Sequence, residues 1–192
     1  MERLQYRKEN DLIIVYDEIQ VGDIYLIGIH HWRVLHKEDK KALLICEESI
    51  HLRNYDYQPT TYENSPIREY INHNFLYYDL RCDFIPLIMK TEIIHENGHV
   101  TYDRMFLLSE EEVQRYFKDE SSRKTNVKHS RKYEPWWLRT KENMKSASYV
   151  DSSGKIAHNA STSCLFGCRP AFYMKLDEKI NWIQLNESSD LY

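Results

Sequence analysis

Long apolar runs are missing from this chain of 192 residues. No stretch approaches the roughly 18 apolar residues that a membrane helix needs, so we expect no membrane span. The amino-terminal segment, MERLQYRKEND, lacks the apolar centre of a secretory signal. We therefore expect a cytoplasmic protein whose thiols stay reduced.

Cysteines are few: Cys46, Cys82, Cys164 and Cys168 are the four in the chain. Cys46 ends the apolar run ALLIC, which is typical of a buried strand in which cysteine behaves as a small hydrophobe. Cys164 and Cys168 stand four residues apart, but two thiols are too few for a zinc site. We predict no metal and no cofactor.

An excess of basic residues is also missing, because the net charge is -4 and the isoelectric point is near 6.1. This balance argues against general nucleic-acid binding, which needs a basic surface. Basic residues gather only in residues 121–132, which we call the basic loop, and two interpretations stay open there: a solvated loop or a local nucleic-acid contact. The candidates for that contact are Arg123, Lys124, Lys128, Arg131 and Lys132.

Familiar catalytic motifs are absent: there is no P-loop, no G-x-S-x-G and no G-x-G-x-x-G. The one pattern that resembles a catalytic motif is HENGH, from His95 to His99, which fits the zinc-protease pattern H-E-x-x-H. That pattern works only on a helix, where two histidines one turn apart share a face.

The sequence around HENGH predicts a hairpin rather than a helix. Asn97-Gly98 is the strongest signal for a two-residue type I′ turn, and β-branched and aromatic residues flank it. A two-residue loop pairs His95 with Val100 and directs His95 and His99 to opposite faces. We therefore expect the resemblance to a zinc site to be coincidental.

Hydrophobic patterning predicts an α+β fold: one domain of many short antiparallel strands with two main helices. Three strands are expected within residues 21–46, one at 105–108 and four within 135–176. One helix begins at Ser65-Pro66, and another has the capping box Ser109…Glu112. We divide the chain into an arm (1–20), a core domain (21–176) and a tail (177–192), and the tail is expected to add a strand or a docking segment.

Several segments together resemble one uncharacterised domain family of bacteria and phages, whose members carry WWLRS and GVRPA. The equivalents are WWLRT (136–140) and GCRPA (167–171), preceded by TYENSPIREYIN (61–72) and DRMFLLS (103–109). Here Thr140, Cys168 and Tyr62 depart from the family pattern. The resemblance runs in order from about residue 21 to 176 and implies membership of that family.

The resemblance also implies a fold similar to C-type-lectin-like and formylglycine-generating-enzyme-like domains. Adjacent strand residues face opposite ways, so we expect one of Trp136 and Trp137 in the core and the other over a surface groove. Two arginines in apolar strands are expected to pair with carboxylates or carbonyls. The residues interpreted as scaffold are Trp136, Trp137, Arg139, Gly167, Arg169 and Pro170.

Between the two motifs lies a segment rich in Ser, Asn, Lys and Tyr, a composition typical of adaptable binding loops and also of solvated ones. The candidate binding residues are Lys141, Asn143, Tyr149, Asp151, Lys155, His158 and Asn159. The first hypothesis is a non-enzymatic module that recognises a protein partner, such as a phage-encoded effector that binds a host protein. The alternatives are a thiol- or metal-dependent enzyme built on Cys164, Cys168 and His158, and nucleic-acid binding through the basic loop.

Overall fold

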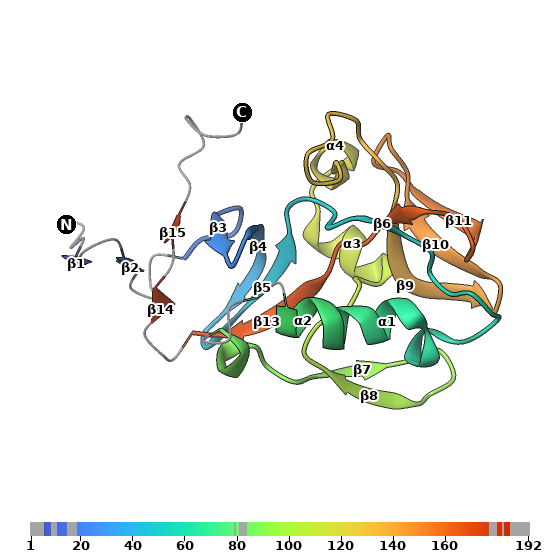
Figure 1. The fold of residues 1–192 in the computed structure, drawn as a ribbon, viewed down its shortest axis with the longest axis horizontal. Coiled ribbons are helices and arrows are strands. Elements are labelled where there is room, and N and C mark those ends of the chain that lie inside the picture. The colour runs from blue at the N-terminus through green and yellow to red at the C-terminus, as the bar shows by residue number, and fades with distance from the viewer. Residues whose placement is uncertain are drawn as a thin grey trace.

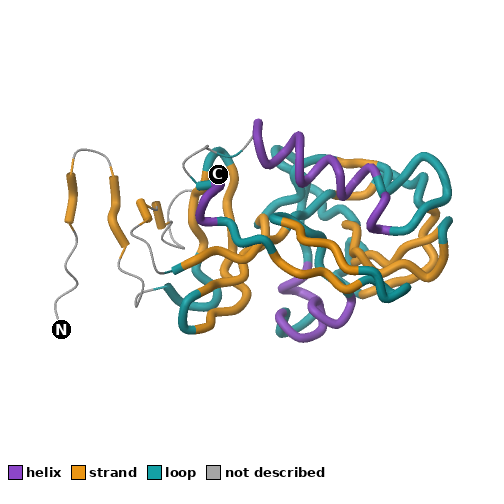
Figure 2. The backbone as a smooth tube through the Cα atoms, turned by 90° about the horizontal axis from the view of Figure 1, so that it is seen from below, coloured by secondary structure: helices purple, strands orange, loops and turns teal. Residues whose placement is uncertain are grey.

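The computed structural model describes residues 6–8, 11–14, 19–78, 80, 84–176, 180–181 and 183–184, and side chains within 19–176. The fold is α+β, with mostly antiparallel strands and a few short helices (Figure 1). Figure 2 shows more strand than helix along the described backbone, with one long helical segment along one side. Cys82 lies outside the described residues.

The central sheet has five strands, and its three middle hairpin-linked strands were expected from residues 21–46. Gly28 adopts a φ of 65° in the first of its two tight turns, a conformation that suits glycine. Across the sheet the strands are β13 (Ala171–Lys175), β5 (Lys41–Cys46), β4 (His30–Glu38), β3 (Ile24–Ile27) and β15 (Ile183–Gln184). Both faces of this sheet are covered, which explains the unbroken apolar run in β5.

A second five-stranded sheet contains WWLRT and the first residue of GCRPA. Its strands, in spatial order, are β11 (Ile156–Ser161), β10 (Ser146–Val150), β9 (Trp136–Asn143), β12 (Phe166–Gly167) and β6 (Leu52–Arg53). The expected last strand, 166–176, is split, because the chain leaves this sheet after Gly167 and enters the central sheet at Ala171. Pro170, which has no N–H to donate, lies at the crossing.

The arm and the tail contribute strands that pair with each other and with the core. β2 (Asp11–Ile14) pairs with β1 (Tyr6–Lys8) on one side and with β14 (Ile180–Asn181) on the other. β15 extends the central sheet by pairing with β3.

The hairpin predicted around Asn97-Gly98 is present, formed by β7 (Thr91–Ile94) and β8 (Val100–Asp103). The predicted register was wrong by one residue, because Ile94 faces Val100 and the His95 N–H donates to the His99 carbonyl at 2.9 Å. The loop therefore has three residues. Gly98 alone takes a positive φ, of 80°, whereas a type I′ turn requires Asn97 to do so as well.

The helices begin where the capping residues predict. Ser65 caps a continuous helical segment made of α1 (Pro66–Tyr70), the π-helical turn η3 (Ile71–Phe75) and α2 (Leu76–Tyr78). The shorter elements are η2 (Tyr62–Asn64), η4 (Ile85–Leu87), α3 (Glu110–Tyr116) and α4 (Glu120–Arg123). The capping box before α3 is confirmed in both directions, through Ser109 and Glu112. No helix in the described ranges has the length and apolar character of a membrane span.

The strand expected at residues 105–108 was wrong. This segment is buried and extended, but only Phe106 forms a bridge, with Ala171. Its other backbone groups pair with different neighbours: the Leu107 N–H donates to the Tyr62 hydroxyl, and the Leu108 carbonyl accepts from the Arg139 N–H. Apolar composition alone does not distinguish such a segment from a strand.

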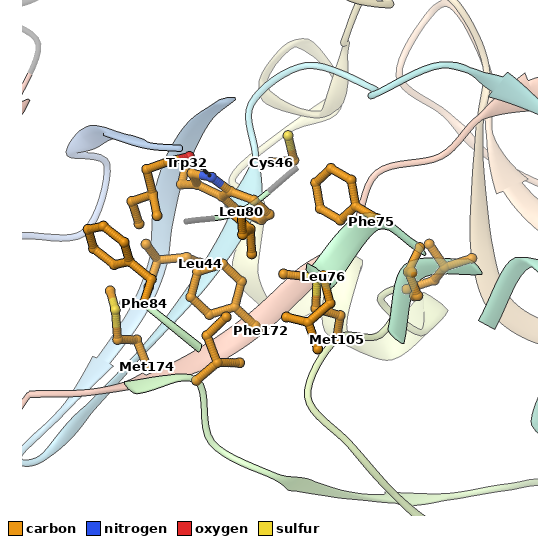
Figure 3. Packing of buried hydrophobic residues seen from close by; sticks show 14 of the residues in the cluster. Trp32, Leu44, Cys46, Phe75, Leu76, Leu80, Phe84, Met105, Phe172 and Met174 are labelled. Carbon is orange, nitrogen blue, oxygen red and sulfur yellow. Dashed lines mark hydrogen bonds between the residues drawn. The ribbon is translucent and has the colours of Figure 1, made fainter. Parts of the chain in front are cut away.

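Two apolar clusters fill the interior, one on each face of the central sheet. Figure 3 shows the larger, in which Trp32 and Phe172 from the sheet meet Phe75 and Leu76 from the helical segment. Trp32 and Phe172 pack edge to face at 4.7 Å between ring centroids. This cluster fixes the helical segment against the sheet, and so positions the helix face that points away from it.

Both motif tryptophans are fully buried, so the expectation that one lies over a surface groove was wrong. They do face opposite sides of β9, Trp136 in the smaller cluster and Trp137 in the larger. Each indole N–H donates to a backbone carbonyl, that of Arg123 and that of Arg53 respectively. The reason is that a second layer covers each face of this strand.

Burial of His30 predicts a loss of stability in acid. Desolvation, with smaller contributions from Lys128 and other cations, lowers the pKa of His30 to about 4. The folded state therefore favours the neutral ring, and this stability is complete above pH ~6.5 and is lost as the pH falls towards 4. We expect a loss of about 1–2 kcal/mol, because partial solvation reduces the full linkage value.

The measurement is urea unfolding at pH 7, 6, 5 and 4.5. A His30→Phe variant, which does not titrate and still packs on Phe75, should show a flatter pH profile than the wild type. Identical slopes for the two proteins would contradict the assignment to His30.

Candidate functional site

The segment proposed as a displayed loop, residues 141–163, is largely the strand meander β9–β10–β11. Lys141, one of its candidate binding residues, is buried: its ammonium lies 2.9 Å from Asp56 Oδ2, and the two side chains are 5% and 2% exposed. The same ammonium lies over the Tyr55 ring at 4.6 Å. Lys141 is therefore committed to an internal ion pair.

Other candidates in the meander form its own turns and packing. The Asn143 amide donates to Ser146 Oγ and its carbonyl oxygen accepts from the Lys145 N–H. Asp151 Oδ1 accepts from two N–H groups of its turn, one of them that of Lys155, whose side chain is exposed. Tyr149 packs on Phe166 and Trp137 rather than standing free.

His158 and Asn159 lie at an irregularity of β11, where Asn159 takes a φ of 60°. His158 Nδ1 lies 3.2 Å from Ser148 Oγ and 3.5 Å from both Glu110 and Glu142. This group is not a Ser-His-acid relay, because a relay uses both ring nitrogens, whereas all three partners gather at Nδ1. The Ser148 hydroxyl is also fully buried and donates to Glu142.

The thiol alternative gains no geometric support. Cys168 is fully buried in the larger cluster, and burial raises the pKa of its thiol to about 12. A nucleophilic cysteine needs a thiolate near neutral pH. Cys164 is half-buried against the same cluster, and His158 makes its contacts with carboxylates and Ser148 instead.

The two arginines interpreted as scaffold are paired with a carboxylate or with backbone carbonyls, as expected. Arg139 donates to both carboxylate oxygens of Glu112 and to the Leu107 carbonyl. Arg169, 1% exposed, donates from Nε to the Cys46 carbonyl at 2.8 Å. A Cβ on Gly167 would stand 2.3 Å from Ser49 Oγ, so this position has room only for glycine. Pro170 is buried, and its carbonyl accepts from the Cys46 N–H.

The HENGH histidines have separate partners on the hairpin. His95 is buried, with Nε2 2.9 Å from Thr101 Oγ1, whereas His99 is exposed, with Nδ1 3.4 Å from Glu63 Oε2. In the observed register His95 and His99 lie directly opposite each other and share a face, so the prediction that they face opposite sides was wrong. The zinc-protease geometry requires two histidines one turn apart on a helix, and this hairpin does not provide it. Within the described ranges, no three His, Cys, Asp or Glu side chains are grouped as metal ligands.

A pocket of about 500 Å³ opens between the helical segment 66–78 and the hairpin β7–β8; we call it the helix–hairpin pocket. In Figure 1 the two elements run side by side, and the Arg68–Asp103 ion pair links them, with Nε 2.8 Å from Oδ2. The π-helical turn η3 contributes Asn72 and His73 to the lining. Such turns widen a helix locally and are frequent at functional sites.

The side chains at the floor of the pocket are held by hydrogen bonds within the protein. Asp103 is 2% exposed and accepts from Arg68 and from the Thr101 hydroxyl. The Asn72 amide donates to the Met105 carbonyl at 2.7 Å, and its oxygen accepts from the Arg104 N–H at 3.1 Å. These groups fix the pocket's shape and leave recognition to the rim.

The rim carries side chains that make no polar or ring contact with other described parts of the protein. Within the described residues, no hydrogen bond, ion pair or ring contact involves the side chains of Glu69, His73, Tyr77 or Lys90. They present an acid, an imidazole, a phenol and an amine around one opening. Such a set suits hydrogen bonding to a ligand that enters from solvent.

Beside the pocket, the outer face of the hairpin carries exposed apolar side chains next to Glu92. Ile94 and Val100 face each other across the strands and are 67% and 45% exposed. Tyr102, 63% exposed, belongs both to this face and to the pocket lining, and its hydroxyl donates to Glu92. An apolar face continuous with a polar pocket is typical of an interaction surface.

Sequence reasoning missed this site. The segment 61–72 was identified only as a helix start and as part of the family resemblance, although four of its residues line the pocket: Glu63, Ser65, Arg68 and Asn72. The available signal was the alternation of β8, which places Val100 and Tyr102 together on a face opposite the buried Asp103.

Comparison with known proteins supplies a family and no function. No curated protein and no solved structure matches the chain. The family model that matches residues 39–176 is described as a domain of unknown function. This range contains the helix–hairpin pocket and the WWLRT and GCRPA motifs, whereas β3 and β4 precede it. The chain therefore belongs to the DUF6273 family.

Proposed function

We propose that this protein is a non-enzymatic binding module that recognises a protein partner through the helix–hairpin pocket and the outer hairpin face. The observation that carries the proposal is the exposed apolar face of Ile94, Val100 and Tyr102 beside a pocket whose rim side chains are unengaged. Burying the apolar face supplies binding energy of about 25 cal/mol per Å². The rim groups supply specificity, because each needs a matching partner once water is excluded.

The arrangement favours a protein partner over a small ligand. The pocket is wide and polar, whereas small-molecule sites are mostly apolar and enclose their ligand. The three apolar side chains instead stand together on the outer face of the hairpin, which an apolar patch on another protein can cover. Tyr77 and Tyr102 are rigid aromatic anchors, the residue type that dominates protein interfaces.

We also propose a structural relationship to C-type-lectin-like domains and a biological role as an effector. β9 and β12 are parallel neighbours, with Gly167 opposite Trp136, so the WWLRT and GCRPA motifs meet at their first residues. This adjacency supports a C-type-lectin-like arrangement, in which such strands flank a variable segment. The family resemblance supports a phage- or mobile-element-encoded effector that acts on a host protein in the cytoplasm.

The test is quantitative affinity capture from a lysate of the bacterium that carries or hosts the gene. We expect Ile94→Ser/Tyr102→Ser to retain at least ten-fold less of a captured partner than the wild type. The control is Tyr57→Ser/Leu165→Ser, which removes the same kinds of exposed side chain, 71% and 59% exposed, outside the pocket. Equal capture by the wild type and both folded variants would overturn the proposed surface.

A further inference from the structure

The basic loop is folded rather than merely solvated. Val127 forms a bridge with Ser49, and Asn126 forms another with Tyr133. The Thr125 hydroxyl donates to the Glu47 carbonyl at 2.9 Å, which ties the loop to the end of β5. His129 takes a φ of 68°, which closes a tight turn. The loop therefore presents its side chains from a defined backbone.

The cations of this loop lack carboxylate partners. Between Ser121 and Tyr133 the sequence has five lysines and arginines and no acid. None of the five forms an ion pair within the described ranges, whereas Arg33, Arg68 and Arg139 each hold a carboxylate. Arg131 and Lys132 are exposed, and the Lys128 ammonium lies 2.7 Å from the Ile29 carbonyl.

A cation from a neighbouring strand, Arg53, lies near this loop, beside a group of histidines. Lys128 lies close enough to His30 to help lower its pKa, together with His31 and His51. Arg53 stacks on the Tyr70 ring at 3.9 Å and lies 3.3 Å from His51 Nε2. Arg53 therefore joins the five cations of the loop in one region, although the chain as a whole carries a net charge of -4.

An exposed aromatic ring stands among these cations. Tyr133 is 58% exposed, and the Lys124 ammonium lies 5.7 Å from the centre of its ring. Cations that follow a phosphate backbone, together with a ring on which a base can stack, are the two elements of single-strand recognition. An acidic peptide would use the cations but not the ring face.

We propose that the basic loop binds single-stranded nucleic acid, with Lys128, Arg131 and Lys132 contacting phosphates and Tyr133 stacking on a base. This surface is separate from the helix–hairpin pocket. Figure 1 shows α4, which begins the basic loop, on the opposite side of the molecule from the hairpin β7–β8. Binding at one surface therefore leaves the other accessible.

The test is fluorescence anisotropy of the full chain with labelled 20-nucleotide oligo-dT and oligo-U at several salt concentrations. Arg131→Ala/Lys132→Ala should weaken binding at least ten-fold and reduce the slope of log K against log salt by about 1.4. The matched control, Lys40→Ala/Lys145→Ala, makes the same change in net charge at exposed positions elsewhere and should bind as the wild type does. Preference for oligo-dT or oligo-U identifies DNA or RNA as the ligand.

Tyr133→Ala separates nucleic acid from other polyanions. This variant should bind the oligonucleotides about five-fold or more weakly, because one stacked base is lost, and should bind polyglutamate as the wild type does. Equal affinity of the wild type for polyglutamate and oligonucleotide would overturn the proposal in favour of an acidic protein ligand. Absence of binding to either oligonucleotide at low salt would overturn it outright.

Discussion

Lys141→Ala should destabilise the protein by about 3–5 kcal/mol, because it leaves the Asp56 carboxylate buried without its counter-ion. The two side chains are almost fully buried, and the ammonium also contacts the face of the Tyr55 ring. The pair joins β9 to the loop that leads into the helical segment, so its loss weakens a contact between distant parts of the chain. Urea unfolding at pH 7 measures the change.

Two further variants make this result interpretable. Lys155→Ala, at an exposed lysine of the same meander, should change the unfolding free energy by less than about 0.5 kcal/mol. Lys141→Met/Asp56→Asn, which removes both charges and keeps similar volumes, should recover much of the loss. A Lys141→Ala variant as stable as Lys155→Ala would show that Lys141 is solvated, as a displayed binding residue would be.

Trp136→Ala and Trp137→Ala should each cost about 3–5 kcal/mol, because each removes a fully buried indole from a different apolar cluster. The Arg169 guanidinium lies over Trp136, 5.0 Å from the centre of the indole ring. Trp137 packs on Phe166, with 4.6 Å between the ring centroids. Guanidinium chloride unfolding of the single variants measures both losses.

Such losses approach the whole stability of a small domain, so the milder Trp→Phe replacements serve where the alanine variants do not fold. We expect both phenylalanine variants to be destabilised to a similar extent. A cost below 1 kcal/mol at one position only would instead support the arrangement expected from sequence, in which one indole covers a surface groove.

Local features of the fold were predictable from sequence, because their causes are local. Ser65, Pro66 and the Ser109…Glu112 pair mark helix starts through hydrogen bonds within one turn of chain. The hairpin was predicted for the same reason. Its register was not, because Asn97-Gly98 suits both a two-residue and a three-residue loop, and packing of Ile93 against the core selects the one that is formed.

The candidate site was not predictable in the same way. Composition pointed to residues 141–159, but polar side chains there satisfy one another, as Lys141 does with Asp56 and Asp151 with its own turn. The helix–hairpin pocket depends on Arg68 meeting Asp103 across 35 positions of chain, and nothing in the local sequence specifies that contact. Exposed apolar residues such as Ile94 acquire meaning only when the fold leaves them uncovered.

The most direct test of the proposed binding surface is site-specific photo-crosslinking in lysate. A photoreactive phenylalanine analogue is placed at Tyr102 on the hairpin, and in a second variant at Tyr57, an exposed tyrosine outside the pocket. The proposal predicts a discrete crosslinked protein from position 102 that is absent from position 57 and is displaced by excess unlabelled wild type. No specific crosslink at position 102, or the same products from both positions, would contradict a protein-binding role for this surface.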